Sequence, residues 1–376
     1  MQKKQSKKII FIAALAIHFF TGFAFPKSAL IMVQEGIFLF NKGKLQLAKV
    51  KFESAANMCP TLDRPYFYMG RIAYSECRLD SARDYFSKAL KNDPGLSDAY
   101  LWLGRVYIKK GLKASFFKKP FYAAKAKKLL EKAVRLDKNN TIARHDLLYF
   151  YSVVPGIFGG GKNRAAAQAE SLRVQNPWEG FKAYAKFYEL TGQRDLAIAE
   201  YKKAIDAFPE EIQFYSALGE IYRKDGNLSA ALTLYRNAET RHPKLRKQLL
   251  FYRGQIYGDM GNDGKALAML DSALAADPAR LAIYPEIGRI VLRLKQRYSH
   301  GRNCLLHYVQ STQNRCDETF SRACYDLAQI YQRLNDAENA AIYYRRVIDL
   351  NASKKLTHNA HNALKHISKT TDQQIK

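Results

Sequence analysis

Apolar residues recur every three to four positions through nearly all of residues 29–352, which is the spacing of an amphipathic α-helix. No segment shows the alternation of apolar and polar residues that marks a half-buried strand. The helical segments come in pairs joined by short turns with Gly or polar residues, such as Thr-Gly-Gln at 191–193 and Asp-Gly-Asn at 225–227. The pattern therefore predicts an all-α chain built from helix hairpins.

A ladder of small, aromatic and proline residues repeats along these hairpins. Gly and Ala let two antiparallel helices approach closely, an aromatic side chain fills the space between neighbouring hairpins, and Pro ends the second helix. The five copies are Gly36, Ala48, Phe52, Ala55 and Pro60; Gly70, Ala82, Phe86, Ala89 and Pro94; Ala185, Ala197, Tyr201, Ala204 and Pro209; Gly219, Ala231, Tyr235, Ala238 and Pro243; and Gly254, Ala266, Leu270, Ala273 and Pro278.

The ladder and its 34-residue period resemble the tetratricopeptide repeat family over about residues 29–352. The resemblance implies a right-handed superhelical solenoid of about nine helix hairpins. We predict this solenoid over residues 25–352, with enlarged turns near 110–122 and 154–163. A capping helix and tail over 353–376 would cover the last hairpin with an apolar face that includes Leu356, Ala360 and Leu364.

The N-terminus has the pattern of an export signal. A basic leader with Lys3, Lys4, Lys7 and Lys8 precedes an apolar run of seventeen residues, and small residues at 22 and 24 suit a signal peptidase. We predict a signal peptide over residues 1–24, and an uncleaved anchor is the alternative. The chain is then expected in the periplasm, or anchored in the inner membrane and facing the periplasm.

The chain is strongly basic, with 61 Lys and Arg against 34 Asp and Glu and a formal charge of +27. Removal of residues 1–24 takes away four lysines and leaves 27 − 4 = +23. Such a charge attracts acidic proteins, anionic lipids or nucleic acid. Because an exported protein rarely meets nucleic acid, we expect an acidic protein or peptide partner, with an anionic membrane surface as a second class.

The residues 156–163, Gly-Ile-Phe-Gly-Gly-Gly-Lys-Asn, approach the phosphate-binding loop of nucleotide hydrolases. That loop needs a preceding strand and a Ser or Thr after the Lys, whereas Asn163 has no hydroxyl and the preceding segment has the helical pattern. We therefore interpret residues 154–163 as an enlarged turn between two helices. Backbone amides after Asn163, with Lys162 beside them, could still hold an anion.

The resemblance to tetratricopeptide repeats implies a partner-binding groove lined by the first helix of each hairpin. Its cations and aromatic side chains suit an acidic peptide or a C-terminal carboxylate. The predicted groove residues are Arg64, Phe67, Arg71, Tyr74, Arg105, Lys109, His145, Tyr149, Lys182, Lys186, Arg223, Arg289, Arg293, Tyr325 and Arg333, together with Ile108, Glu189, Glu220, Lys224, Gln255 and Gln329. The alternative is that these charged side chains only solvate the helices.

A basic insert lies in the third hairpin, where residues 105–135 hold eleven Lys and Arg and one acid, Glu131. We expect a long second helix starting at Pro120, with the phenylalanines of residues 116–121 packed on neighbouring repeats. Contact with an anion or an anionic membrane is the alternative. The cations available for such contact are Lys118, Lys119, Lys125, Lys127, Lys128 and Lys162.

The remaining chemistry-bearing residues give no catalytic or metal pattern. Of the five cysteines, we expect at most one bridge, among Cys304, Cys316 and Cys324, and no zinc site. His358, His361 and His366 are interpreted as a solvated face of the capping helix, and Trp102 and Trp178 as core residues. We expect no enzyme activity, no cofactor and no metal.

The sequence thus favours a non-catalytic scaffold or adaptor that mediates protein–protein interactions in the cell envelope. A protein that binds anions or membrane surfaces through the basic insert is one alternative. A periplasmic accessory to solute transport is another, and the fold alone does not choose among them.

Overall fold

The computed structural model describes residues 27–312, 317–351 and 353–375, with side chains up to residue 367. Within these residues the secondary structure is helical and contains no strand, as predicted. The first helix spans residues 27–41. The others are α2 Leu45–Met58, α3 Asp63–Ser75, α4 Leu79–Asn92, α5 Ser97–Lys113, η1 Phe116–Lys118, α6 Lys119–Leu136, α7 Thr141–Val153, η2 Gly156–Phe158, α8 Lys162–Gln175, α9 Pro177–Leu190, α10 Arg194–Ala207, α11 Ile212–Lys224, α12 Leu228–Arg241, η3 Pro243–Leu245, α13 Arg246–Asp259, α14 Asp263–Ala276, α15 Ile283–Leu294, α16 Tyr298–Ser311, α17 Glu318–Arg333, α18 Ala337–Leu350 and α19 Lys354–Ile375.

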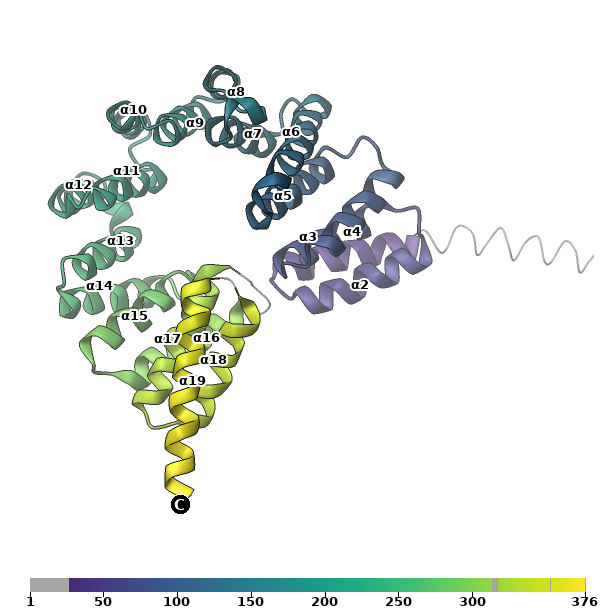
Figure 1. Cartoon of the computed structure of the whole chain (residues 1–376). Helices are drawn as coiled ribbons and strands as arrows, with labels where there is room; N and C mark the ends of the chain where they lie inside the picture. Colours follow the sequence, from purple (N-terminus) through teal and green to yellow (C-terminus); the bar gives the residue numbers. More distant parts are fainter. Residues whose placement is uncertain (1–26, 313–316, 352, 376) are drawn as a thin grey trace, which may run out of the picture. The chain divides into compact units, whose positions relative to one another are not determined.

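The long helices pair into consecutive antiparallel hairpins, from residues 27–41 with α2 through to α17 with α18 (Figure 1). The described part of the chain holds nine such hairpins followed by α19, which confirms the predicted helical-repeat solenoid with its final helix. The chain divides into two compact units, Met1–Gln168 and Ala169–Lys376, and the boundary falls inside α8. Each unit is described by itself below.

The small residues of the ladder allow the close helix contact that the spacing predicts. A Cβ atom added to Gly70 on α3 would lie 2.6 Å from the Phe86 ring on α4, too close for any side chain larger than hydrogen. Ala82 and Ala89 are fully buried beside Phe86. Phe86 also stacks on Trp102 of the next hairpin, with ring centroids 6.5 Å apart. The aromatic residue therefore fills space both within its hairpin and toward its neighbour.

The turns within the hairpins are formed by the Gly and polar residues that the sequence predicts. Gly226 adopts a φ of +71°, a left-handed conformation that glycine reaches without a steric cost. Asn227 follows it, and its side chain accepts a hydrogen bond from the Ala230 amide at the start of α12. The same arrangement recurs at Gly261 and Asn262 before α14. Local sequence therefore sets where each second helix begins.

The glycine-rich segment is a turn between α7 and α8, and a helix rather than a strand precedes it. This geometry excludes the nucleotide-hydrolase loop. A Cβ at Gly160 would lie 1.5 Å from the Val154 carbonyl oxygen, so the chain can fold back this tightly only with glycine there. The amides of Gly160 and Gly161 already donate to the Pro155 and Tyr151 carbonyls and are not available to an anion.

The insert of the third hairpin differs from its expected packing. The second helix, α6, begins at Lys119, close to the predicted start, and η1 precedes it. The phenylalanines were expected to pack on neighbouring repeats, but Phe116 is 72% exposed, Phe117 is 90% exposed and Phe121 is 54% exposed. That expectation is wrong because α5 continues to Lys113 and the short turn that follows, with η1, contains no buried residue.

The cysteines also depart from expectation. Cys77 is disulfide-bonded, whereas Cys59, Cys304 and Cys324 are free thiols. A bridge among the last three cysteines is therefore wrong, because any such pair would need Cys304 or Cys324. Both pack as small apolar side chains in the core of α16 and α17, and burial raises the pKa of their thiols to about 11 and about 12.

The final helix covers the end of the second unit. Leu356 and Ala360 are buried against the residues of α17 and α18, and Ala363, Leu364 and Ile367 pack on the same cluster. These are the residues that the helical spacing placed on one face, so the predicted cap is confirmed. Predicted signal residues 1–24 lie outside the described residues.

Candidate functional site

A cavity of about 230 Å³ lies in the first unit, between the first helices of three consecutive hairpins. We call it the first-helix cavity. It is lined by Tyr74 of α3, by Trp102, Arg105 and Ile108 of α5, and by Asp146 and Tyr149 of α7. Its lining combines apolar ring surface with a small number of charged groups, which is the usual composition of a recognition site.

Arg71 lies beside this cavity and stacks between aromatic rings of two neighbouring hairpins. Its guanidinium carbon is 4.7 Å from the Phe40 ring centroid and 4.7 Å from that of Trp102. Its buried Nε has no hydrogen-bond partner, and no ion pair holds it within the described residues. Burial lowers the pKa of Arg71, an effect that Tyr68 and the carboxylate of Asp98 oppose and Arg105 reinforces. Its desolvation is therefore not offset by a hydrogen-bonded carboxylate.

Arg105 lies on the same indole but has an acid partner. Its guanidinium carbon is 4.6 Å from the Trp102 centroid, and it donates to both Asp146 carboxylate oxygens, at 2.5 and 3.0 Å. This two-pronged pair fixes the Arg105 side chain against the cavity wall. Trp102 was interpreted as a core residue, but it is only partly buried and lines the cavity, so that interpretation is wrong in part. Sequence reasoning did not select Asp146.

Tyr74 completes the wall nearest the disulfide-bonded Cys77. Its ring packs edge-on against Trp102, with centroids 5.3 Å apart, and Lys109 Nζ lies 4.3 Å from its centroid. Burial raises the pKa of the Tyr74 hydroxyl, so Tyr74 stays neutral. Arg71, Arg105 and Lys109 thus surround two aromatic rings, with Asp146 as the one carboxylate in the cavity lining.

The structure brings together six of the predicted groove residues of this unit, namely Arg71, Tyr74, Arg105, Ile108, Lys109 and Tyr149. Phe67 does not belong to the set. It is 2% exposed and packs in the core because its position on α3 points toward α4. Arg64 is exposed at the start of α3 and pairs with Asp63, and His145 is half-buried on α7.

Most of the predicted groove cations of the second unit have acid partners instead. Arg223 donates to Glu220 at 2.7 Å and to Asp259 at 2.9 Å. Arg289 donates to Glu286 at 2.5 Å and lies 3.8 Å from Asp259. These pairs link α11, α13 and α15 and leave little uncompensated positive charge on this set of first helices.

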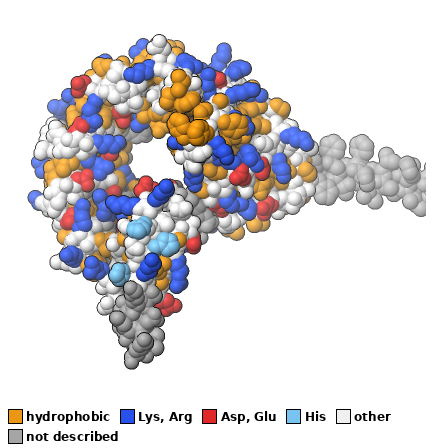
Figure 2. Space-filling model, in the orientation of Figure 1, with side chains coloured by type: hydrophobic (Ala, Val, Ile, Leu, Met, Phe, Trp, Pro, Cys, Tyr) orange, Lys and Arg blue, Asp and Glu red, His pale blue; other side chains and the backbone are white. Residues whose placement is uncertain are grey.

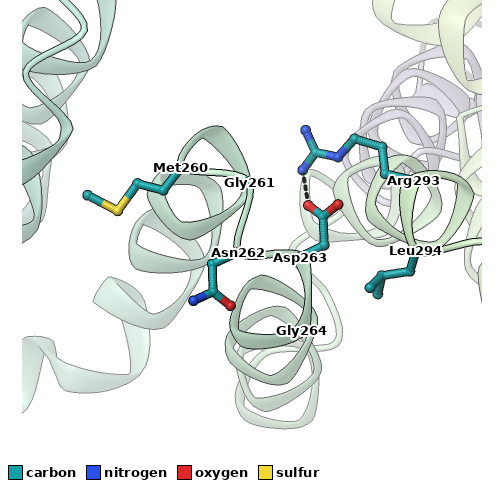
Figure 3. A pocket seen from close by; sticks show the side chains of 7 residues that line it. All are labelled: Met260, Gly261, Asn262, Asp263, Gly264, Arg293 and Leu294. Atoms are coloured by element: carbon teal, nitrogen blue, oxygen red, sulfur yellow. Dashed lines mark hydrogen bonds and ion pairs between the residues drawn. The ribbon is translucent and has the colours of Figure 1, made fainter.

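Arg293 is held at the edge of a shallow hollow that Figure 3 shows. Its guanidinium donates to Asp263 at 2.5 Å, the dashed line in the figure, and to the Gly258 carbonyl at 2.9 Å. The hollow is formed by the turn between α13 and α14 and by the end of α15. Arg293 therefore links this turn to α15 of the next hairpin, and this structural role accounts for its position.

The other predicted groove residues of the second unit do not converge on a cavity. Lys182 pairs with Glu179 and lies over Trp178, which is partly buried, and Lys186 pairs with Glu189. Tyr325 is half-buried against Tyr344, with ring centroids 5.5 Å apart. Arg333 is exposed at the end of α17.

The cations proposed for anion or membrane contact lie mostly at the exposed end of the third hairpin. Lys118, Lys119, Lys125 and Lys128 are exposed, and Lys127 is half-buried and pairs with Glu131. Lys162 is exposed at the start of α8.

The described residues offer no group of three or more His, Cys, Asp and Glu side chains placed to bind a metal. His358, His361 and His366 are exposed on α19, where Figure 2 shows pale-blue side chains along the helix. Across residues 27–312, 317–351 and 353–375, no helix has both the length and the apolar content needed to cross a bilayer.

Comparison with known families supports the repeat architecture. Tetratricopeptide repeat models match residues 190–246 and residues 321–354. A model described as the second ARM domain of tetratricopeptide repeat protein 21 matches residues 40–111, which include most of the first-helix cavity. Such repeats bind proteins and peptides and generally form non-catalytic scaffolds.

The similar proteins are much longer than this chain. Superkiller protein 3 of Schizosaccharomyces pombe is 23% identical over 284 residues, covering 70% of this chain and 19% of its own length. Tetratricopeptide repeat protein 21B of Mus musculus is 22% identical over 343 residues, covering 77% of this chain and 25% of its own length.

Among solved structures, yeast Tom70 is similar with a TM-score of 0.40 and 15% identity, over 93% of this chain and 96% of its own. The matched repeat segments and the paired helices together carry the assignment. The chain therefore contains segments that match tetratricopeptide repeats, within an architecture of paired helices.

Proposed function

We propose that the chain is a scaffold that binds an acidic peptide segment, or a C-terminal carboxylate, of a partner protein in the first-helix cavity. The observation that carries this proposal is Arg71, a half-buried guanidinium between Phe40 and Trp102 whose buried Nε has no hydrogen-bond partner and which forms no ion pair within the described residues. A ligand carboxylate would complete its hydrogen bonding in a partly desolvated place, where a charge-assisted bond is strong. Tyr74, Trp102 and Tyr149 would hold an apolar side chain beside it.

The contrast between the two units supports this assignment. In the second unit Arg223 and Arg289 pair with acids of their own helices and with Asp259 of α13, the first helix of the hairpin between them. In the first unit Arg105 pairs with Asp146, whereas Arg71 forms no ion pair among the residues that the structure describes. Arg71 and Arg289 each follow the glycine of their first helix, Gly70 and Gly288, yet only Arg289 is held by an ion pair among the described residues.

Tryptophan fluorescence can test the proposal directly because the chain has two tryptophans, Trp102 and Trp178. In a Trp178→Phe background, Trp102 reports on the cavity alone. An acidic peptide with a free C-terminus should change its emission on binding. Arg71→Gln should weaken binding at least tenfold, since it removes the charge but keeps hydrogen-bonding groups.

Arg64→Gln is the matched control, because Arg64 lies on the same helix but is exposed and paired with Asp63. It should leave peptide affinity unchanged. Equal affinity for a neutral, amidated peptide, or equal loss in both variants, would contradict the proposal.

We also propose that this binding takes place in the cell envelope after export. The support is the basic leader and apolar run of residues 1–24. N-terminal sequencing of the protein from fractionated cells should find Phe25 as the first residue in the envelope or periplasmic fraction. An intact Met1 in the cytosolic fraction would contradict this location.

A further inference from the structure

An exposed apolar tip stands at the end of the third hairpin. We define the aromatic tip as Leu112, Phe116, Phe117 and Phe121, which are all more than half exposed. Figure 2 shows a block of hydrophobic side chains, with Lys and Arg beside it, where Figure 1 places α5 and α6. Isolated exposed apolar residues are common in folded proteins, but a cluster of large ones marks a contact surface.

The rings of the tip contact each other and nearby lysines rather than the core. Phe116 and Phe117 pack edge to face, with centroids 5.9 Å apart. Lys125 Nζ lies 4.3 Å from the Phe121 centroid. Ile157, from the glycine-rich turn, is 86% exposed, and the neighbouring Gly159 lies against the Lys127 side chain of α6. Two loops of the first unit therefore present apolar side chains to solvent beside α6.

A cationic hollow of about 560 Å³ lies under the tip. Lys110, Lys113 and Lys118 line it together with Ser115, and Asp80 is the one carboxylate in its lining. Lys110 pairs with Asp80, while Lys113 and Lys118 form no ion pair within the described residues. The hollow is of a size to admit a phosphate-bearing headgroup, with two exposed lysines and a hydroxyl to bind it.

From this arrangement we infer that the aromatic tip and its cationic hollow anchor the chain to an anionic lipid bilayer. Charge complementarity requires an anionic occupant, because the insert of residues 105–135 carries eleven cations and one acid, and the exposed rings beside these cations favour a lipid surface. Phenylalanine rings beside lysines match the layered structure of a membrane surface, where apolar groups enter the acyl boundary and cations meet headgroups. The rings also project outward, whereas a peptide-binding site would be concave.

This inference is independent of the proposed peptide site. The peptide cavity depends on Arg71 and Trp102, and the membrane surface depends on residues 112–121. Variants of one surface should leave the other intact, so failure of either proposal is recognised separately.

Flotation of the full-length chain with vesicles tests the inference. Vesicles of 30% phosphatidylglycerol in phosphatidylcholine should bind the chain at least tenfold more tightly than pure phosphatidylcholine. Phe116→Ser with Phe117→Ser should weaken that binding at least tenfold, and so should Lys118→Glu with Lys119→Glu. Every protein compared contains residues 1–26, so the differences report on the tip.

Matched controls make the same chemical changes elsewhere on the surface. Lys202→Glu with Lys203→Glu reverses two adjacent exposed lysines on α10. Leu47→Ser with Val50→Ser removes two exposed apolar side chains from α2, each 57% exposed. Both controls should bind vesicles like the unaltered chain, and equal weakening in the controls would overturn the inference.

A Phe117→Trp variant gives a second readout that does not depend on loss of binding. Its emission should shift to shorter wavelength with phosphatidylglycerol vesicles and be quenched by brominated acyl chains. An unshifted emission in bound protein would overturn the inference. Equal binding to neutral vesicles, or a tip that captures an acidic protein but no vesicle, would overturn it as well.

Discussion

The two arginines at Trp102 have different roles because their partners differ. Arg105 donates to Asp146 and is fixed in place, whereas Arg71 stacks on the same indole with no acid to bind. Planar guanidinium groups of this kind stack on aromatic faces and can also donate to carboxylates. At the scale of the residue, the role of each arginine depends on which carboxylates lie within hydrogen-bonding distance of its guanidinium.

Asp326 should make the stability of the second unit depend on pH. It is 7% exposed on α17, and burial raises the pKa of its carboxyl from 3.8 to about 7, a shift that Glu286 reinforces and Arg322 and Arg289 oppose. Between about pH 4 and pH 7 the folded state binds a proton that the unfolded chain has released. The free energy of unfolding therefore falls as the pH rises through this window.

Asp326→Asn should remove this dependence, because the amide remains neutral. One pKa unit corresponds to about 1.4 kcal/mol, so the variant should be more stable than the unaltered chain at pH 8 by a few kcal/mol. Urea unfolding at pH 5 and pH 8, followed by circular dichroism, measures the difference. A variant whose midpoint falls with pH as steeply as before would show that Asp326 is not the group responsible.

Substitution of glycine by alanine should have opposite effects on stability at Gly70 and at Gly264. A Cβ at Gly70 would lie 2.6 Å from the Phe86 ring, whereas one at Gly264 in α14 would meet nothing within 4 Å. Gly70→Ala should therefore lower the free energy of unfolding by about 1–3 kcal/mol through overpacking. Gly264→Ala should raise it by about 0.5–1 kcal/mol, since alanine favours the helix. Urea midpoints that move in the same direction would contradict this account.

At the scale of the element, each helix obtains its stability from its neighbours in the array. The apolar stripe of one hairpin is buried on the next, as the stacking of Phe86 on Trp102 illustrates. In such an array contacts reach only adjacent hairpins, so the last hairpin needs a covering helix. In the second unit α19 has this role, with Leu356 and Ala360 buried on α17 and α18.

Leu356→Ala should loosen the end of the second unit in particular. Leu356 is 1% exposed, and truncating a buried leucine costs about 2–5 kcal/mol. Hydrogen exchange should show faster exchange in α18 and α19 and unchanged exchange in α3 and α4. Ile342→Ala is the control, because Ile342 is 48% exposed on α18 and its loss should change stability by less than about 0.5 kcal/mol. A uniform loss of protection would contradict a local cap.

At the scale of the whole molecule, the formal charge of +27 is unevenly compensated. In the second unit the predicted groove residues Arg223, Arg289 and Arg293 all form ion pairs with Asp or Glu side chains. In the first unit the lysines of the insert are mostly exposed beside a single glutamate. The uncompensated positive charge is therefore concentrated in the insert of the first unit rather than spread evenly along the chain.

Salt should separate the two surfaces proposed for the first unit. Raising NaCl from 50 to 500 mM shortens the screening length to about 4 Å, which weakens exposed lysines most. Vesicle binding should fall at least tenfold, while peptide binding should fall only about two- to threefold because Arg71 is half-buried. Flotation and Trp102 fluorescence over one salt series measure both. Parallel losses would contradict the assignment of the peptide to a half-buried site.

The sequence by itself determined the repeating fold, because that information is local and periodic. The spacing from Gly70 to Phe86, the turn at Gly226 and Asn227, and the apolar face of α19 each depend on residues close along the chain. The same spacing also placed Arg71, Tyr74 and Arg105 on first helices. The periodic spacing predicts the fold because, in a repeat array, each hairpin packs only against the hairpins next to it.

Only the tertiary structure decided which of these side chains remain available. Asp146 reaches Arg105 from a helix 41 positions away, and Asp259 reaches Arg223 from 36 positions away. The exposure of Phe116 and Phe117, and the burial of Phe67, follow from where neighbouring helices end. Pairing and burial depend on distances between helices remote in the chain, and no local pattern of residues encodes those distances.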